Sequence, residues 1–364
     1  MPPCNHSDNR GSYSSMPIEL NKIRVCVVIL NWNNWNATIS CIKSLMSDGF
    51  PNLHITICDN NSGDGSFEKI KIWIESIPGF VGCAVLENSE DRSIYDSDIN
   101  AIYEYEHDHD LNKAGCAFLI LKTRQNYGYA KGNNLACNFV INRYNPGYIL
   151  ILNNDVIIKN SVVGLLVESL HNNKSYGIIG PVIRDIEGNH TIQESGRTFS
   201  RRIKLERNVQ PGLSGMLKVD KIMGSCMLVR TSVFSELGGF DENYFLYYED
   251  SDFCIRAYCL GYNTAVLFDA EIYHSRQGSS SPEIKYYYFT RNRLLFLGKH
   301  TTGLYFTVSV ALHVLVYINR SILFFINEKD RSIAKAILMG LYDGITGRFG
   351  RGRFNEMKKS EIER

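Results

Sequence analysis

The chain lacks an excess of charge of either sign. Its 39 basic and 38 acidic residues leave a formal net charge of +1 over 364 residues. Because binding through overall charge requires a clear basic excess, we expect no nucleic-acid partner. The ten cysteines form no C-x-x-C pair, and several lie inside apolar runs, where they are typical of small buried hydrophobic residues. This usage favours a reducing compartment, the cytoplasm.

Residues 1–22 lack the apolar run that a secretory signal requires. We interpret this polar segment as a disordered lead, followed by one large domain at residues 23–300 and an extension at 301–364. Glycine-rich nucleotide motifs are also missing. Gly63 and Gly65 do not complete G-x-G-x-x-G, and no G-x-x-x-x-G-K-[ST] occurs. The dinucleotide-binding and P-loop classes are thereby excluded.

The chain does contain a series of strongly apolar, β-branched runs that alternate with helical patterns. The runs are Arg24–Asn31, His54–Asp59, Ala117–Lys122 and Tyr148–Leu152. Runs that are apolar on both faces and separated by helices predict an α/β fold with a mostly parallel central sheet flanked by helices. In such sheets ligands bind beyond the carboxyl ends of the strands. The residues after each strand therefore form the candidate site.

Polar residues follow three of these runs. They are Asn31-Trp32-Asn33, the segment Asp59–Ser66, and Asn153-Asn154-Asp155. Asp59 can accept the imide N–H of uracil or thymine, or it can belong to an Asx-rich turn that caps the next helix, and the two roles can coexist. Asp155 is a hard oxygen ligand beside two amides, suited to Mg²⁺ or Mn²⁺ on a diphosphate. Its alternative is a plain turn aspartate.

Acids and aromatic rings crowd the segment Gly238–Arg256, GGFDENYFLYYEDSDFCIR. Glu249, Asp250 and Asp252 lie within four positions, so mutual repulsion predicts a raised pKa for at least one carboxyl group. The aromatic rings reinforce this effect by desolvation, and a carboxylate held in this way can accept a proton near neutral pH. The alternative is an acidic first turn of a helix, where carboxylates suit the helix dipole.

In their order along the chain, six segments resemble the family-2 inverting glycosyltransferases of the GT-A fold, in the rhamnosyltransferase-like and galactofuranosyltransferase-like branch. These segments are NWN, CDNNSGDGS, NYGYAKGNN, LILNND, GSCMLVR and the segment Gly238–Arg256. Each is weak alone, but the ordered set is specific, and it spans roughly residues 24–300. The resemblance implies the GT-A, or nucleotide-diphospho-sugar transferase, fold with a C-terminal helical extension.

Position by position, the resemblance implies Asp250 as the catalytic base, with Glu249 and Asp252 as its neighbours on the acceptor side. It also implies a donor pocket in which Asp59 binds the pyrimidine base. The other residues that would line this pocket are Asn31, Asn33, Asn126, Lys131, Asn133 and Asn154.

The resemblance further implies a Mg²⁺ or Mn²⁺ site. Asn153 and Asp155 occupy the outer positions of the family's D-x-D motif, and His274 aligns with the histidine that completes the metal site. The motif reads Asn-Asn-Asp here, which leaves Asp155 as its only negative charge. Because an amide ligates a hard cation less strongly than a carboxylate, we expect weaker metal dependence, with the donor diphosphate supplying most of the negative charge.

An enzyme of this kind needs one base, a charge sink for the departing diphosphate, and alignment. We therefore expect transfer of a sugar such as rhamnose from a UDP- or dTDP-sugar to a hydroxyl of a glycan or lipid-linked saccharide, in cell-surface polysaccharide synthesis. One displacement inverts the anomeric carbon. Two alternatives stay open: a nucleotidyltransferase, which releases nucleoside monophosphate, and a non-catalytic or metal-independent nucleotide-sugar-binding protein.

Two regions lie outside these motifs. The first, about residues 87–115, carries nine acidic residues against Arg92 and Lys113. It includes the run His107-Asp108-His109-Asp110, which has the composition of a metal site. We interpret the region as a solvated acidic insertion without chemistry.

The second region is the C-terminal extension, in which Gly303–Ile326 is apolar and long enough to span a bilayer. Four polar residues share one helical stripe on this segment: Ser309, His313, Arg320 and Asn327. We expect an amphipathic helix in the membrane interface, with packing on the catalytic domain as the alternative. A basic tail (Arg348, Arg351, Arg353, Lys358 and Lys359) favours an anionic cytoplasmic leaflet. We therefore expect peripheral contact with the inner face of the cell membrane.

Overall fold

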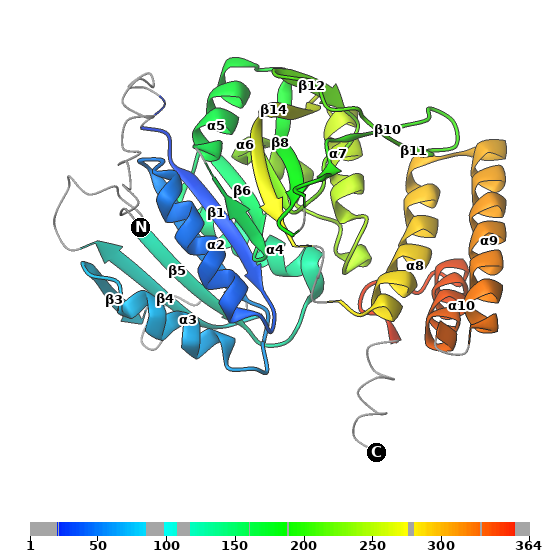
Figure 1. Ribbon diagram of the computed structural model, residues 1–364, viewed down its shortest axis with the longest axis horizontal. Coiled ribbons are helices and arrows are strands. Elements are labelled where there is room, and N and C mark those ends of the chain that lie inside the picture. Colours follow the sequence, from blue (N-terminus) through cyan, green and yellow to red (C-terminus); the bar gives the residue numbers. More distant parts are fainter. Residues whose placement is uncertain are drawn as a thin grey trace, which may run out of the picture.

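The computed structural model describes residues 20, 22–84, 98–107, 117–159, 161–187, 189–275, 280–327 and 330–353. One large sheet with helices on both faces forms most of the molecule, and three helices stand beside it at the C-terminal end (Figure 1). Apart from residues 20 and 22, the lead expected at 1–22 lies outside the described residues. The two lysines of the expected basic tail, Lys358 and Lys359, also lie outside them.

Four parallel strands form the centre of the sheet: β1 (Val25–Asn31), β2 (Leu53–Asp59), β5 (Ala117–Thr123) and β6 (Tyr148–Asn153). β1 pairs in parallel with both β2 and β6, and β2 pairs in parallel with β5. Nearly all of their side chains are buried, which is why these runs are apolar throughout rather than alternating. The prediction of a mostly parallel central sheet is confirmed.

Further strands, paired mostly in antiparallel, widen the sheet on both sides. They are β3 (Phe80–Ala84), β4 (Ile99–His107), β7 (Val156–Ile158), β8 (Tyr176–Asp185), β9 (Ile192–Glu194), β12 (Met216–Val219), β13 (Cys226–Arg230) and β14 (Asn263–His274). The strand order is β12-β14-β8-β13-β6-β1-β2-β5-β4-β3, with β7 paired to β14 and β9 paired to β8. A separate two-stranded sheet consists of β10 (Arg197–Phe199) and β11 (Glu206–Asn208). Because β13 runs antiparallel to β6, the residues just before β13 lie at the carboxyl ends of the parallel strands.

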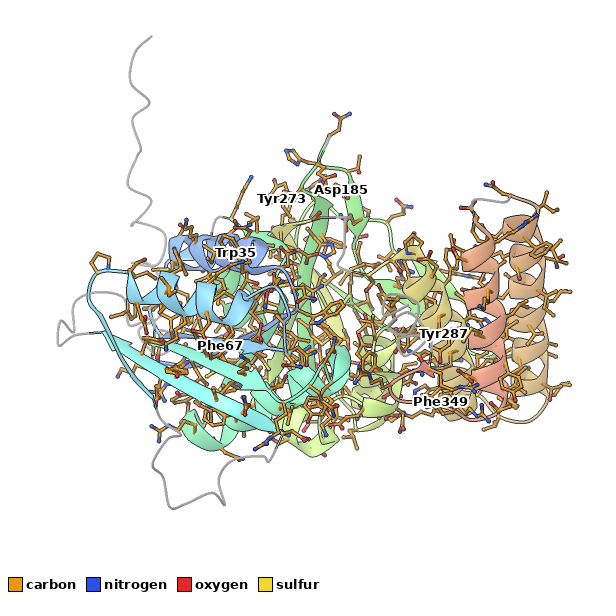
Figure 2. All side chains as sticks on the ribbon, turned by 90° about the horizontal axis from the view of Figure 1, so that it is seen from below. Trp35, Phe67, Asp185, Tyr273, Tyr287 and Phe349 are labelled. Carbon is orange, nitrogen blue, oxygen red and sulfur yellow. The ribbon has the colours of Figure 1, made fainter. Side chains whose placement is uncertain are left out.

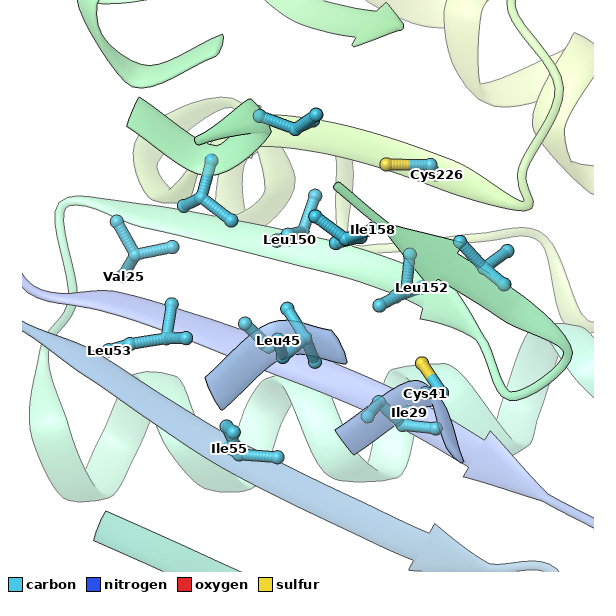
Figure 3. Packing of buried hydrophobic residues seen from close by; sticks show 14 of the residues in the cluster. Val25, Ile29, Cys41, Leu45, Leu53, Ile55, Leu150, Leu152, Ile158 and Cys226 are labelled. Carbon is cyan, nitrogen blue, oxygen red and sulfur yellow. The ribbon is translucent and has the colours of Figure 1, made fainter. Parts of the chain in front are cut away.

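Helices cover both faces of the sheet. One core includes α2 (Trp35–Asp48), α3 (Ser66–Glu75) and α5 (Val162–Asn172), and the other includes α4 (Gly128–Tyr144), α6 (Thr231–Leu237) and α7 (Glu249–Cys259). Because side chains alternate across a strand, β1 sends Val25 and Ile29 to the first core and Cys26 and Val28 to the second. Figure 3 shows the first core, where Leu45 of α2 packs with the side chains of β1, β2 and β6.

Part of the acidic segment expected as a solvated insertion belongs to the sheet. Its residues 99–107 form β4, which lies between β3 and β5. The carboxylate of Glu104 contacts α4, where it accepts hydrogen bonds from Arg143 at 2.9 Å and from Tyr144. Residues 85–97 and 108–116, and with them most of the His-Asp run, lie outside the described residues.

Three helices follow the sheet: α8 (Pro282–His300), α9 (Gly303–Ile326) and α10 (Arg331–Ile345). α10 lies so close to α8 that a Cβ atom on Gly340 would meet the carbonyl oxygen of Tyr287 at 2.5 Å. In Figure 2, Tyr287 and Phe349 mark this helical group, which lies on the opposite side of the molecule from Trp35 and Phe67. The predicted C-terminal helical extension is therefore present.

The polar stripe expected on α9 is divided between two environments. Ser309 and His313 are buried, and His313 Nε2 lies 2.9 Å from the carbonyl oxygen of Thr290 on α8. Arg320 and Asn327 are exposed. Large apolar side chains are exposed along the rest of the helix, among them Leu304, Leu315, Ile322, Leu323 and Phe325. In the described part of the chain, α9 is the one helix that is long and apolar enough to cross a membrane, by length and composition alone.

Candidate active site

The carboxyl ends of β1 and β2 meet at one edge of the sheet, where Asn31 and Asp59 are register partners. Asn31 Nδ2 donates to Asp59 Oδ1 at 2.8 Å, and Asn31 Oδ1 accepts from Thr38 Oγ1 at 2.7 Å. Asn154, directly after β6, donates to Asn31 Oδ1 at 3.3 Å and to Thr38 Oγ1 at 3.0 Å. The fold thus brings the ends of all three strands together.

The turn after β2 holds the carboxylate of Asp59. In addition to Asn31, Asp59 accepts from Ser62 Oγ at 2.6 Å and from the Ser62 N–H at 3.1 Å. These three hydrogen bonds leave about one of the four acceptor positions of the carboxylate open. Asn33 Oδ1 accepts from the Gly63 N–H at 2.7 Å, which ties the first strand end to the same turn. The Asx-rich turn is therefore present, and it fixes the buried Asp59 at the sheet edge.

The start of α4 lies next to this turn. Asn126 Oδ1 accepts from the Gly128 N–H at 2.8 Å and from Asn60 Nδ2 at 3.2 Å. Lys131 Nζ lies 2.6 Å from Asp98, and both side chains are partly exposed. Asn133 is fully buried, and its Oδ1 has no hydrogen-bond partner among the described residues. Asn126 and Lys131 therefore border the site, whereas Asn133 lies beneath its surface.

The ends of β6 and β14 carry the candidate metal ligands. His274 Nε2 lies 3.2 Å from Asp155 Oδ1. Gln193 of β9 orients this histidine, because its Nε2 donates to the carbonyl oxygen of His274 at 2.8 Å and to Asp185. Its Oε1 is then left to accept from His274 Nδ1 at 3.0 Å. This assignment places the proton on Nδ1 and turns the lone pair of Nε2 toward Asp155. Asp185 and the neighbouring Tyr273 mark this end of β8 and β14 in Figure 2.

In the neutral form of His274, two hydrogen-bond acceptors therefore face each other 3.2 Å apart, the Nε2 lone pair of His274 and Oδ1 of Asp155. Asn153 Oδ1 and Asp155 Oδ1 are buried without a hydrogen-bond partner in the described part of the chain. Adjacent ligands of an octahedral Mg²⁺ ion, with bonds of about 2.1 Å, lie about 3 Å apart, so a divalent cation fits this pair. No group of three or more His, Cys, Asp or Glu side chains within the described ranges could hold a metal. The chain thus offers part of a coordination shell, and ligand oxygens would complete it.

Asp250, the second residue of α7, is held by donors from two segments. Its Oδ1 accepts from the N–H of Ser251 at 2.6 Å and from Ser251 Oγ at 3.0 Å. Its Oδ2 accepts from the N–H of Gly224, just before β13, at 3.1 Å. The side chain is 13% exposed, and Oδ2 keeps one lone pair that no described donor uses. A carboxylate fixed in this way can accept a proton from a hydroxyl group.

Tyr129 of α4 lies between the candidate base and the candidate metal ligands. Its hydroxyl donates to the carbonyl oxygen of Gly224 at 2.6 Å. Burial raises the pKa of Tyr129, and the carboxylates of Glu249, Asp250 and Asp155 add to the increase. The candidate base and the candidate metal ligand Asp155 therefore both lie near this partly buried phenol.

Glu249 has the perturbed carboxyl group that the acidic run predicts. The side chain is 5% exposed, and its Oε2 has no hydrogen-bond partner among the described residues. Burial, reinforced by the charge of Asp250, raises the pKa of Glu249 well above its ordinary value. Burial thus disfavours the ionised form of Glu249.

Asp252 does not lie with Glu249 on the acceptor side, where the resemblance placed it. It is fully buried and forms ion pairs with Arg256 at 2.6 Å and Lys299 at 2.5 Å. Burial alone would raise the pKa of Asp252, but a hydrogen bond from His300 and the charges of Arg256 and Lys299 hold it below its usual range. The carboxylate joins α7 to the end of α8 and takes no part in the site.

Three aromatic residues just before α7 have left-handed backbone conformations: Phe245 (φ 62°), Tyr247 (φ 68°) and Tyr248 (φ 75°). Such conformations cost on the order of 1–3 kcal/mol for a non-glycine residue. The rings pack on α8, with Phe245 stacked on Tyr288 and Tyr247 stacked on Phe289. Strain and packing together fix the direction of the first turn of α7.

Two buried residues of α8 hold the same turn, and the sequence motifs did not reveal them. Asn292 Nδ2 lies within hydrogen-bond distance of the carbonyl oxygens of Tyr244 (2.9 Å), Leu246 (2.8 Å) and Tyr247 (2.8 Å). Arg291 also donates to the carbonyl oxygen of Tyr244, at 3.0 Å. The one signal in the sequence is the polar run Thr290–Arg293, which interrupts the aromatic and apolar residues 286–297 of this helix.

Comparison with known proteins reveals relatives that transfer sugars. The model of glycosyl transferase family group 2 matches residues 148–339, more than half of the chain. The low-salt glycan biosynthesis hexosyltransferase Agl10 of Haloferax volcanii is 32% identical over 196 residues, which cover 53% of this chain and 58% of that protein. The rhamnosyltransferase WbbL of Escherichia coli is 32% identical over 143 residues, which cover 36% of this chain and 54% of that protein. The chain thus spans about half the length of these curated relatives.

Solved structures share the architecture. The mannosyltransferase PcManGT from Pyrobaculum calidifontis, in complex with GDP-Man and Mn²⁺, superimposes with a TM-score of 0.51 over 89% of this chain and 88% of that chain. At 11% identity this likeness shows the fold alone, and the fold is the GT-A type predicted from the motifs. Together with the family model that covers more than half of its length, this establishes that the chain belongs to glycosyl transferase family group 2.

Proposed function

We propose that this protein is an inverting glycosyltransferase that moves a sugar from a nucleoside-diphosphate sugar to a hydroxyl group of a glycan or lipid-linked saccharide. The geometry of Asp250 carries the proposal. Fixed donors orient both of its oxygens, and one lone pair of Oδ2 stays available at the carboxyl edge of the sheet. A general base needs this combination of orientation and access.

The proposed reaction is a single displacement. The acceptor hydroxyl oxygen attacks the anomeric carbon from the face opposite the diphosphate, while Asp250 Oδ2 takes the hydroxyl proton. The new glycosidic C–O bond forms as the bond to the diphosphate breaks, and the leaving group departs with the electron pair. One such step inverts the anomeric configuration. Burial disfavours a second negative charge on Glu249 beside the base, because it raises the pKa of that carboxyl group.

We assign the divalent cation, Mg²⁺ or Mn²⁺, to Asp155, His274 and Asn153. The support is the pair of acceptors 3.2 Å apart and the two buried oxygens without partners among the described residues. When bound, a divalent cation neutralises the charge that develops on the diphosphate. The contribution of the chain is to direct the Nε2 lone pair of His274 through Gln193. An amide in place of the first acid would weaken the metal dependence.

The donor nucleotide would occupy the edge formed by β1, β2 and the start of α4. Asp59 offers its open acceptor position to the imide N–H of uracil or thymine, and Asn31 keeps the carboxylate in place. The remaining residues that we assign to this pocket are Asn33, Asn126, Lys131, Asn133 and Asn154. A hexosyltransferase and a rhamnosyltransferase among the relatives support transfer of a hexose, with rhamnose as one candidate. The proposed contact of Asp59 with uracil or thymine is what favours UDP or dTDP as the nucleotide.

The test uses the purified full chain and a panel of UDP-, dTDP-, GDP- and CMP-sugars. Because a ligand raises the melting temperature by mass action, a thermal-shift series identifies the donor nucleotide. Incubation of that donor with saccharide acceptors is expected to release nucleoside diphosphate and to give a glycoside of inverted configuration by NMR. Release of nucleoside monophosphate would instead indicate a nucleotidyltransferase. Binding without consumption of any donor would indicate a non-catalytic protein.

We also propose peripheral contact with the inner face of the cell membrane, in cell-surface polysaccharide synthesis. The apolar side chains exposed on α9 continue into a cavity of about 580 Å³ beside α10. The residues that line it are mainly apolar and basic: Phe325, Arg331, Ala334, Lys335, Leu338, Met339, Tyr342 and Arg353. Apolar side chains beside cations suit the boundary between acyl chains and anionic headgroups. A lipid-linked acceptor would then meet the enzyme at this surface.

A further inference from the structure

Lys221 lies beside the proposed base and has no part in the reaction described above. It follows β12, and its backbone is fixed to Arg197 of β10 by two hydrogen bonds, from the Arg197 N–H to Lys221 O at 3.0 Å and from the Lys221 N–H to Arg197 O at 3.1 Å. Only 12% of the side chain is exposed. Lysine is seldom buried to this extent unless its ammonium group is paired.

The ammonium group of Lys221 reaches the base both directly and through a serine. Lys221 Nζ donates to Ser251 Oγ at 2.8 Å and lies 3.9 Å from Asp250 Oδ1. The Ser251 hydroxyl donates in turn to Asp250 Oδ1 at 3.0 Å. Because the lysine can only donate, it directs the serine proton toward Asp250. This chain of hydrogen bonds ends on Oδ1 and leaves the free lone pair of Oδ2 for the acceptor hydroxyl.

Acids crowd the surroundings of Asp250. The charge of Asp250 contributes to the raised pKa of the buried Glu194. Glu206 lies 3.9 Å from Lys221 Nζ. Arg197 is already engaged with Glu194 and Glu206, in ion pairs of 2.8 Å each. Within the described residues, Lys221 is the one cation within 4 Å of Asp250. Burial opposes its charge, but Asp250 and Glu206 raise the pKa of Lys221 above its ordinary value, so the ammonium group stays charged.

We propose that Lys221 is a positioning residue for Asp250, which it holds through the Ser251 hydrogen bond in the orientation that exposes Oδ2. The inference rests on the proposed function of Asp250 as the base. The cation and the serine hydroxyl both act on Oδ1, the oxygen that does not take the proton. Lys221 can therefore tune the base without contacting the substrate.

Lys221→Met removes the charge and keeps a long side chain. We expect kcat to fall by about 10- to 100-fold, less than the roughly 10²- to 10⁴-fold that a general base itself contributes, because Asp250 stays in place. The KM for the donor is expected to change by less than about threefold, because the nucleotide edge is untouched. Without the cation a proton binds Asp250 more readily, so the acidic limb of the kcat profile moves to higher pH.

Lys221→Arg is expected to recover part of the loss. Ser251→Ala, which keeps the ammonium group, is expected to lower kcat by about tenfold or less.

The other charged and titratable groups that face Asp250 are unchanged in Lys221→Met. They are Glu194 (β9), Arg197 (β10), Glu206 (β11), Tyr129 (α4), Tyr248, and Glu249 and Cys254 (α7). These groups contribute equally to the pH profiles of wild type and variant. The difference between the two profiles therefore measures the effect of the Lys221 ammonium group. Lys218→Met is the matched control, because Lys218 is an exposed lysine on the neighbouring strand β12.

A second measurement needs no turnover. Carbon NMR of isotope-labelled aspartate, with the Asp250 signal assigned through Asp250→Asn, is expected to show a higher titration midpoint for Asp250 in Lys221→Met than in wild type or Lys218→Met. If the midpoint and kcat both stay at the wild-type values, the inference is wrong even though the enzyme transfers sugar. If the midpoint rises but wild type transfers no sugar from any donor, the coupling of Lys221 to Asp250 stands and the proposed function fails.

Discussion

Two aspartates that are neighbours in the sequence, Asp250 and Asp252, occupy opposite surroundings in the folded chain. Two steps along an α-helix rotate a side chain by about 200°. One carboxylate therefore reaches the N–H of Gly224 at the sheet edge, and the other reaches Arg256 and Lys299. A run of acids does not reveal this separation by itself. The acidic run predicted a perturbed carboxyl group correctly, but it grouped Asp252 with the site.

Asp250→Asn is expected to lower turnover about a thousandfold or more and to leave nucleotide affinity within about twofold. The amide keeps the shape of the side chain but cannot take a proton. Initial rates give kcat, and titration calorimetry gives the affinity for the nucleoside diphosphate. Asp269→Asn, which changes an exposed carboxylate on β14, should keep wild-type turnover. Turnover of Asp250→Asn within tenfold of wild type would remove Asp250 as the base.

Gln193→Leu is expected to weaken binding of Mn²⁺ in the presence of nucleoside diphosphate by about tenfold or more, because the partner that fixes the tautomer of His274 is lost. Titration calorimetry with Mn²⁺ measures the affinity directly and needs no acceptor. Gln210→Leu, at an exposed position, is the control and should bind Mn²⁺ like wild type. Equal affinity in wild type and Gln193→Leu would show that His274 does not act as an oriented ligand.

At the scale of elements, the strand ends could be predicted from the sequence, because a continuous apolar run indicates a buried strand and the first polar residue after it marks the end. Asn31, Asp59 and Asn154 come together for that reason. Gln193 could not be found in this way. It lies on the three-residue strand β9, which is too short to show a period, and its place beside His274 depends on the register of β9 and β14 with β8.

The same limit applies to α9, whose polar and apolar stripes predicted a helix but not which stripe would pack inward. The structure buries Ser309 and His313 against the protein together with part of Val310, Val314, Tyr317 and Phe324, and it exposes most of the other apolar side chains. A stripe of small and neutral polar residues can satisfy its hydrogen bonds inside the protein, as the contact of His313 with Thr290 shows. Periodicity alone therefore left the orientation of this helix open.

Asn292→Ala is expected to lower the free energy of unfolding by about 2–3 kcal/mol, because the partly buried carbonyl oxygens of Leu246 and Tyr247 lose this donor and that of Tyr244 keeps only its other donors. We expect turnover to fall more than nucleotide affinity, because the turn that fixes the start of α7, and with it Asp250, becomes less ordered. Chemical denaturation gives the stability. Asn319→Ala, which removes an exposed amide on α9, is the control and should change stability by less than about 0.5 kcal/mol. A variant at position 292 as stable as the control would show that the turn is held by ring packing alone.

On the scale of the whole molecule, the candidate active site and the apolar surface of α9 belong to different parts. The candidate site lies at the edge of the sheet, α9 belongs to the C-terminal helical group, and α8 contacts both. Removal of everything after Lys299 would uncover α8, because Gly340 and Gly344 bring α10 into contact with Tyr287 and Leu294. Membrane association is therefore better tested in the full chain, by substitutions on the exposed face of α9.

The double variant Leu315→Glu, Leu323→Glu is expected to bind anionic vesicles at least about tenfold more weakly than wild type, since each leucine loses apolar burial in the lipid. Wild-type binding should also weaken as salt rises. Vesicle sedimentation measures both effects, and Leu213→Glu, at an exposed position away from α9, is the control. If the double variant binds like wild type, α9 is not the contact surface. Resistance of wild type to salt and alkaline carbonate would indicate a spanning helix instead.

The left-handed turn before α7 has a mechanical consequence. Glycine would adopt these backbone angles without strain, yet the chain carries aromatic rings there, and those rings are pressed against Tyr288 and Phe289. The turn cannot relax while α8 stays in place, and α8 is also the helix on which α9 and α10 rest. A displacement of α8 is therefore expected to move this turn through the ring contacts, and with it the first residues of α7, Glu249 and Asp250.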